Sequence, residues 1–163
     1  TTSWTADGKR FPVVVRTVSE TIGLDIEIGV HRKSFHEAAR RLRAFHEARG
    51  LENGTRFAVE LIVEELATNI ARYAFPNGSD HHFGLHLELL PDVVVVVLTD
   101  DGVAFDPTRV APPQRPQRLS EATPGGLGLQ LVREFADTVV YCRDGHLNRT
   151  RVSIVRTRVD GSS

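Results

Sequence analysis

Residues 62–74 read Ile-Val-Glu-Glu-Leu-Ala-Thr-Asn-Ile-Ala-Arg-Tyr-Ala and lie within a helix that the sequence predicts from about Thr55 to Ala74. Glu65 and Asn69 are four positions apart, so a helix places both side chains on one side, about one turn from each other. A carboxylate can accept a proton from a hydroxyl group, and an amide oxygen suits Mg²⁺ beside phosphate oxygens. Taken alone, the pair is more simply explained as two solvated residues of an amphipathic helix.

A second segment, Leu98-Thr-Asp-Asp-Gly-Val-Ala-Phe-Asp-Pro107, follows a continuous apolar strand predicted at residues 93–98. Asp100 leaves this strand toward Gly102, where the absence of a Cβ atom lets a flat ligand approach the backbone. A carboxylate in this place can accept a hydrogen bond from an exocyclic amine such as that of adenine. Alone, an ordinary Asp-Gly turn explains the same residues.

A third segment, Pro124-Gly-Gly-Leu-Gly-Leu-Gln-Leu-Val-Arg133, opens a short helix predicted at residues 126–136. Glycines at a helix start expose free backbone N–H groups at its positive end, which suits phosphate. The segment is neither a dinucleotide fingerprint nor a Walker loop, because no Lys-Ser/Thr pair follows the glycines and no parallel βαβ unit surrounds them. Alone, it is typical of a flexible hinge that leads into a helix.

The pattern of apolar residues places the other elements around these segments. Alternation with period two, or a continuous apolar run, predicts strands at residues 11–18, 23–30, 83–89, 93–98, 138–142 and 152–155. Three- and four-residue steps predict a first helix at 34–49, which Gly50 and the pair Asn53-Gly54 are expected to end. Hairpins with grouped helices indicate an α+β fold, a two-layer α/β sandwich with a mainly antiparallel sheet and helices on one face.

Composition narrows the class of protein. The chain has 163 residues, which suits one domain, and its net charge of −1 argues against binding nucleic acid or anionic membrane by bulk charge. Cys142 is the single cysteine, so neither an internal disulfide nor a thiolate zinc cluster is expected. The longest apolar run, residues 93–98, is too short for a membrane span, and no signal peptide is evident. These features predict a cytoplasmic protein.

Together, in this order and spacing, the three segments resemble the N box, G1 box and G2 box of the GHKL (Bergerat) ATP-binding fold, which histidine kinases, gyrase and MutL share. Within that fold, Glu65-Leu-Ala-Thr-Asn69, Asp100-Asp-Gly-Val-Ala-Phe-Asp-Pro107 and Gly125-Gly-Leu-Gly-Leu129 look most like the RsbW-like anti-sigma-factor serine kinases. The resemblance covers roughly residues 22–157. It predicts a kinase domain at 21–158, with residues 1–20 as an extension or extra strand and 159–163 as a disordered tail.

The resemblance implies a role for each matching residue. Asn69 would be the ligand of a Mg²⁺ ion that bridges the ATP phosphates, and Glu65 would be the general base that takes the proton from an attacking serine. Asp100 would bind the adenine amine, and Gly102 would let the base lie close. The start of the last helix, with Gly126, Leu127, Gly128 and Leu129, would approach the phosphates.

The proline-rich stretch at residues 106–124 would be a mobile lid over the nucleotide. Any of Arg109, Arg115 and Arg118 in it could neutralise the transferring phosphoryl group, and the sequence does not choose among them. Two positions depart from the family pattern. Ala104 stands where a second glycine is usual, which could loosen nucleotide binding, and Tyr73 stands where related kinases often have a histidine.

The function that the resemblance implies is a Mg·ATP-dependent protein serine kinase that acts as an anti-sigma factor. It would bind either an RNA polymerase sigma factor or a STAS-domain anti-anti-sigma factor, and would phosphorylate the latter on serine. A homodimer is expected, with the sheet edge near residues 13–18 as one possible contact. Two alternatives stay open: a nucleotide-regulated or nucleotide-free anti-sigma binding module without kinase turnover, and the detached catalytic domain of a sensor histidine kinase.

Overall fold

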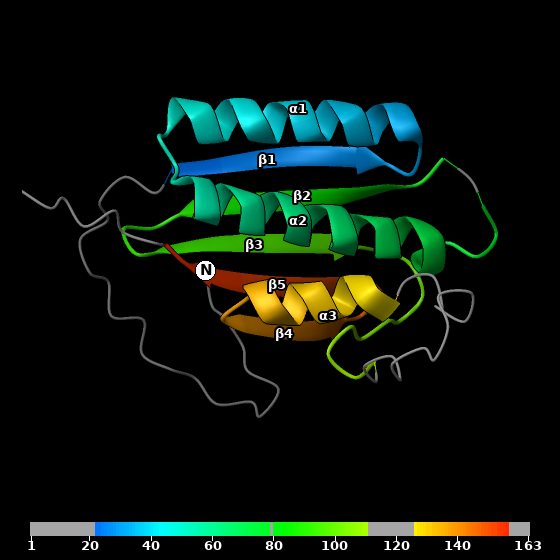
Figure 1. The fold of residues 1–163 in the computed structure, drawn as a ribbon. Coiled ribbons are helices and arrows are strands. Elements are labelled where there is room, and N and C mark those ends of the chain that lie inside the picture. The colour runs from blue at the N-terminus through cyan, green and yellow to red at the C-terminus, as the bar shows by residue number, and fades with distance from the viewer. Residues whose placement is uncertain (1–21, 79, 111–125, 157–163) are drawn as a thin grey trace, which may run out of the picture.

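The computed structural model describes residues 22–78, 80–110 and 126–156. In chain order these form β1 (Ile22–Gly29), α1 (Arg32–Ala48), α2 (Asn53–Asn69), a π-helical turn (Ile70–Ala74), β2 (His82–Leu89), β3 (Val93–Asp100), α3 (Gly126–Phe135), β4 (Thr138–Asp144) and β5 (Leu147–Val155). The strands of this described part make one sheet in the order β1-β2-β3-β5-β4, with every neighbouring pair antiparallel. Figure 1 shows all three helices on one face of the sheet. The predicted two-layer α+β sandwich is therefore confirmed.

The core lies between the sheet and the helices. The register aligns Ile26 of β1 with Leu85 of β2, Leu98 of β3 and Thr150 of β5, so these side chains share the helix-covered face. The apolar members of this row are almost fully buried, and burying each such side chain contributes about 1.5–3 kcal/mol. The alternation of apolar and polar residues in the sequence therefore follows the face of each strand that packs against the helices.

Several element boundaries differ from the prediction. The pair Asn53-Gly54 opens α2 instead of ending the first helix, which ends before Gly50 with its positive φ of 61°. α1 begins at Arg32 because the His31 side chain caps it, accepting a hydrogen bond from the Ser34 amide at 3.2 Å. β3 continues two residues past the predicted end, to Asp100, so that Asp100 is paired within the sheet.

Some predictions fall on other parts of the chain. The strand at 11–18, the dimer edge within it, the tail at 159–163 and residues 111–124 of the loop lie outside the described residues. Among the described residues, no helix combines the length and the hydropathy that crossing a membrane requires.

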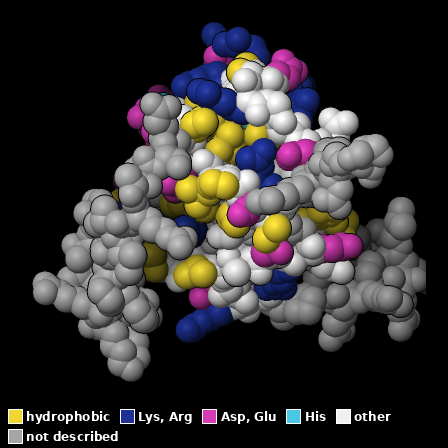
Figure 2. All heavy atoms as spheres, turned by 90° about the vertical axis from the view of Figure 1, so that its left-hand side faces the viewer, with side chains coloured by type: hydrophobic (Ala, Val, Ile, Leu, Met, Phe, Trp, Pro, Cys, Tyr) yellow, Lys and Arg dark blue, Asp and Glu magenta, His cyan; other side chains and the backbone are white. Residues whose placement is uncertain are grey.

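The end of the molecule where α2 begins carries exposed apolar and basic side chains. Figure 2 views this end and shows hydrophobic side chains at the surface, with Lys and Arg gathered over α1. Phe57 of α2 is 58% exposed and lies edge-to-face with Phe135 of α3, their ring centroids 5.5 Å apart. The arginine side chains of α1, including Arg40, Arg41 and Arg43, are exposed.

A fully buried histidine makes the stability of the fold depend on pH. His46 of α1 is 0% exposed; its Nδ1 atom lies 3.4 Å from Glu60, and its Nε2 atom has no hydrogen-bond partner. Burial lowers the pKa of His46, while Glu60 opposes that shift and nearby Arg56 adds to it. The unfolded chain therefore takes up this proton first as the pH falls.

We expect the free energy of unfolding to fall as the pH drops below about 6.5, the ordinary pKa of histidine, until the lower pKa of the folded state is passed. Urea denaturation at about pH 7.5 and about pH 5.5 measures the difference. His46→Gln should flatten this dependence, whereas His36→Gln, at an exposed position of the same helix, should leave it as in the wild type. Equal slopes for His46→Gln and wild type would contradict the assignment.

Candidate functional site

The three sequence segments meet at one end of the sheet. As Figure 1 shows, α2 and β3 end there, and α3 and β5 begin there. This end of the sheet lies opposite to the end of the molecule that faces the viewer in Figure 2. Asp100, Asn69 and Asn148 are all buried at this end, with 7%, 5% and 3% of their surfaces exposed. Buried polar side chains need partners, so their gathering at this end indicates a hydrogen-bond network or a ligand site.

A small cavity lies between α2, the end of β3 and the start of β5. Its volume is about 20 Å³, and its walls are formed by Leu66, Asn69, Ile70, Ala74, Asp100, Phe105, Pro107, Asn148 and Thr150. Polar groups therefore converge in a mainly apolar space that has room for about one water molecule. Phe105 and Pro107 belong to the loop after β3, so displacement of that loop would enlarge the cavity.

A second, wider cavity lies between α2 and the start of α3. Its volume is about 310 Å³, and it is lined by Glu64, Glu65, Thr68, Asn69, Arg72, Leu127, Gly128 and Leu131. Glu65 and Asn69 do face the same space, as their spacing predicts. Asn69 lines both cavities, and its Nδ2 atom is buried without a hydrogen-bond partner. An amide in this state is a polar group that a bound ligand could satisfy.

Another depression, of about 530 Å³, lies on the opposite face of the sheet, where Asp25, His86 and Thr99 line it. It includes Asp100 at its edge but not Glu65, Asn69 or Gly128. Because the sheet separates it from the helix side, it does not join the three segments.

Two glycines allow close packing at the candidate site. A Cβ atom on Gly128 would overlap the Oε2 atom of Glu65, so the start of α3 lies directly against this carboxylate. A Cβ atom on Gly102 would lie 2.5 Å from the Cβ atom of Ala74 and closer still to the Ala74 carbonyl oxygen. That carbonyl also accepts a hydrogen bond from the Val103 amide at 2.9 Å. The chain's own packing thus requires Gly102, which meets backbone atoms, whereas a side chain at position 128 would displace the flexible end of Glu65.

The backbone between α2 and the following loop departs from an α-helix. Residues 70–74 form a π-helical turn, and π-helical turns are frequent at functional sites. Ile70 and Ala74 from this turn line the small cavity. Tyr73, also in this turn, stacks on Phe105 with ring centroids 5.9 Å apart. Tyr73, which stands where related kinases often have a histidine, therefore contacts a residue of the cavity wall.

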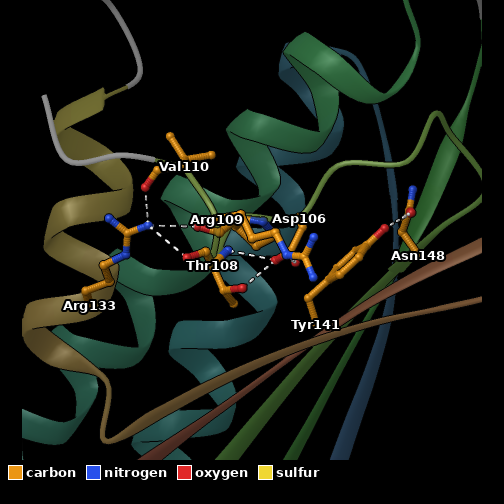
Figure 3. A network of polar contacts seen from close by, with 8 residues as sticks. Asp106, Thr108, Arg109, Val110, Arg133, Tyr141 and Asn148 are labelled. Carbon is orange, nitrogen blue, oxygen red and sulfur yellow. Dashed lines mark hydrogen bonds and ion pairs between the residues drawn. The ribbon is translucent and has the colours of Figure 1, made fainter. Parts of the chain in front are cut away.

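Asp100 is held by donors from two segments. Its Oδ1 atom accepts hydrogen bonds from the Gly102 amide at 3.0 Å and from Asn148 Nδ2 at 2.8 Å. Asn148 in turn accepts a hydrogen bond from the Tyr141 hydroxyl at 2.6 Å, which Figure 3 shows. The aspartate thus has a fixed orientation at the border of the small cavity.

The first residues of the proline-rich stretch are anchored to α3. Arg133 donates hydrogen bonds to the carbonyl oxygens of Pro107, Thr108 and Val110, drawn as a fan of dashed lines in Figure 3. Arg109 is 88% exposed at its side chain and forms an ion pair with Asp106 at 3.2 Å. Among the three arginines that are candidates to neutralise the phosphoryl group, Arg109 is therefore at the surface beside its ion-pair partner Asp106. Arg115 and Arg118 lie outside the described residues.

The remaining predicted residues differ in exposure. Leu127 is 64% exposed, whereas the Leu129 side chain is 4% exposed and belongs to the core. Gly126 is the first residue of α3. Ala104 is exposed, so its extra methyl group has room that the usual glycine would leave empty.

Sequence reasoning missed the residues that support the site from β4, β5 and α3, namely Arg133, Tyr141, Arg143, Asn148 and Thr150. One signal for two of them was present. Asn148 and Thr150 alternate with exposed Arg149 and Arg151 in phase with the buried Val152 and Ile154, which places two polar side chains on the buried face of a strand. The partners of Asn148 could not be found in this way, because they depend on the sheet register.

The oxygen atoms of the side chains around the wider cavity can serve as ligands for a magnesium ion that is bound together with a nucleotide. Asn69 lines this cavity beside Glu65, so an amide oxygen of the kind that Mg²⁺ binds is available next to the space for the phosphates. The described residues contain no group of three or more His, Cys, Asp or Glu side chains able to hold a metal by themselves. Since Mg²⁺ usually takes few protein ligands and completes its shell with water and phosphate oxygens, one amide oxygen is a sufficient donor when a nucleotide is bound.

Comparison with known proteins identifies the family of this chain. Residues 31–154 match the family model described as the histidine kinase-like ATPase domain. Serine/threonine-protein kinase BtrW from Bordetella bronchiseptica is 38% identical over 100 residues, which cover 58% of this chain and 69% of that protein. Serine-protein kinase RsbW from Staphylococcus aureus is 28% identical over 92 residues, which cover 53% of this chain and 58% of that protein.

A solved structure, the histidine kinase domain of the EL346 blue-light activated histidine kinase from Erythrobacter litoralis, has a TM-score of 0.43 and 17% identity to this chain. The match covers 75% of this chain and 59% of that one.

The chain belongs to the histidine kinase-like ATPase domain family. Its relationship to BtrW and RsbW places it among the serine/threonine-protein kinases of that family, which confirms the resemblance drawn from the three segments.

Proposed function

We propose that this protein is a Mg·ATP-dependent serine kinase that acts as an anti-sigma factor in a partner-switching module. It phosphorylates a STAS-domain anti-anti-sigma factor on serine and binds an RNA polymerase sigma factor in the alternative complex. The names of its relatives BtrW and RsbW support the kinase activity, and the family match supports the use of ATP.

The observation that carries the proposal is the position of Asn69 on the wall shared by two cavities. One cavity is bordered by Asp100, and the other by Glu65 and Gly128. A nucleotide with its base toward Asp100 and its phosphates toward Gly128 passes Asn69 between the two ends. An amide at that point can bind the ion that accompanies the phosphates.

In this proposal the small cavity receives the adenine. The second oxygen of Asp100 accepts a hydrogen bond from the exocyclic amine, and the apolar walls contact the faces of the base. Because the cavity is small, binding displaces the loop that carries Phe105 and Pro107. The phosphates lie at the start of α3, where the backbone N–H groups of a helix end favour negative charge.

The reaction transfers the γ-phosphoryl group to a serine hydroxyl. The serine oxygen forms a bond to the γ-phosphorus while the bond from that phosphorus to the β,γ-bridging oxygen breaks, and ADP leaves. Glu65 accepts the hydroxyl proton. Asn69 would hold the magnesium ion, which would supply positive charge beside the phosphates, and the exposed Arg109 is one cation that can turn toward them after leaving Asp106.

We expect Asp100→Asn to weaken Mg·ATP binding by at least about tenfold, because an amide in this place no longer offers a charged acceptor to the adenine amine. Asn69→Ala should retain binding to free ATP but lose the gain in affinity that Mg²⁺ gives. Titration calorimetry with ATP and ADP, each with and without Mg²⁺, measures both effects.

Asp101→Asn is the matched control, since this neighbouring carboxylate is exposed. Its affinity should equal that of the wild type. A wild-type protein that bound neither ATP nor ADP would contradict the kinase function and favour a binding module that works through protein contacts alone.

A further inference from the structure

We propose that Asn148 is a positioning residue that orients Asp100 for recognition of the adenine amine, and so sets the preference of this site for adenine over purines without that amine. This inference rests on the proposed function, because Asp100 is the group through which Asn148 acts.

The amide nitrogen of Asn148 connects β5 to the segment after β3. Its Nδ2 atom donates to Asp100 Oδ1 at 2.8 Å, to the Val103 carbonyl oxygen at 2.9 Å and, more weakly, to the Gly102 carbonyl oxygen at 3.3 Å. These acceptors lie at the end of β3 and in the loop that follows. Asn148 is 3% exposed, so water does not compete for these contacts.

The amide oxygen is held just as firmly. Asn148 Oδ1 accepts hydrogen bonds from the Tyr141 hydroxyl and from Arg143 Nη1, both at 2.6 Å. Arg143 also donates to the Gly102 carbonyl oxygen at 3.1 Å. With donors on one side and acceptors on the other, the amide cannot rotate without losing several hydrogen bonds.

This arrangement assigns different tasks to the two oxygens of Asp100. Oδ1 accepts from Asn148 and from the Gly102 amide, whereas within the described residues no donor binds Oδ2. Asp100 lines the small cavity, so the second oxygen is the one left for a ligand. Fixing Oδ1 therefore directs the remaining acceptor toward a donor on the base.

The distinguishing experiment compares two nucleotides that differ only in the exocyclic amine. Binding of Mg·ATP and of the Mg complex of purine riboside triphosphate, which lacks the 6-amino group, is measured by calorimetry for wild type, Asn148→Ala, Asp100→Asn and the double variant. We expect Asn148→Ala to weaken ATP binding by about tenfold and to leave binding of the analogue nearly unchanged. The double variant should bind ATP little more weakly than Asp100→Asn, because both changes remove one interaction.

Arg149→Ala is the control, since Arg149 is exposed on the other face of the same strand; it should bind both nucleotides like the wild type. Asn148→Asp keeps the shape of the side chain and replaces the donor by an acceptor. It should show the same selective loss of ATP binding, so the inference can be tested even when the alanine variant does not fold.

Equal weakening for ATP and the analogue, or no weakening for either, would overturn the positioning role while the nucleotide site itself stands. Failure of the wild type to bind ATP is a different result, because it would overturn the proposed function and this inference with it.

Discussion

Replacing Glu65 by Gln is expected to lower the rate of phosphoryl transfer to serine by about 10²- to 10⁴-fold while ATP affinity stays near that of the wild type. Gln has the same shape but cannot take up the hydroxyl proton. The wide cavity places Glu65 beside Asn69, and the missing side chain of Gly128 lets the start of α3 lie against the carboxylate. The rate is measured in single turnovers with a purified STAS-domain substrate, and the affinity by calorimetry.

Glu64→Gln is the matched control for this experiment. Glu64 borders the same cavity and is exposed, so the substitution removes the same charge one position away. We expect it to reduce the rate far less than Glu65→Gln does. Comparable rates for the two variants would show that Glu65 is not the base.

The second large effect is expected for Gly102→Ala. The added Cβ atom would lie 2.5 Å from the Cβ atom of Ala74 and closer to its carbonyl oxygen, so either the loop or the π-helical turn must move. Overpacking of this kind costs about 1–3 kcal/mol of stability. The Gly102 amide donates a hydrogen bond to Asp100, and movement of the loop would break it and change the orientation of Asp100. We therefore expect ATP affinity to fall by at least about tenfold as well. Urea denaturation and calorimetry measure the two effects.

Gly84→Ala is the control, because it tests whether the losses of stability and of ATP affinity are specific to position 102. Its Cβ atom would have its nearest neighbour, the Thr99 carbonyl oxygen, at 3.9 Å, which is ordinary contact. Stability should then stay within about 0.5 kcal/mol of the wild type, with unchanged ATP affinity. A Gly102→Ala protein as stable as Gly84→Ala, with normal affinity, would contradict the packing argument.

The order of elements and the main site candidates follow from local patterns. Period-two alternation in residues 83–89 and helical steps in residues 34–49 depend only on which side of an element is buried, so the sequence predicts them directly. The spacing of Glu65 and Asn69 likewise fixes their common side. The end of β3 was predicted two residues short, because Asp100 and Thr99 lack the apolar character of the preceding valines but still pair with β5.

By itself, then, the sequence determined the fold class, the three segments that form the candidate site and the family to which the chain belongs. Only the tertiary structure decided which distant groups touch them. Asn148 reaches Asp100 across 48 positions in the chain, and Arg133 reaches Pro107 across 26. Gly102 and Gly128 were expected to make room for a ligand, yet each also makes room for a side chain or carbonyl of the chain itself. The physical reason is that periodicity records the burial of a residue, whereas its partner is set by strand register and by the packing of helices on the sheet.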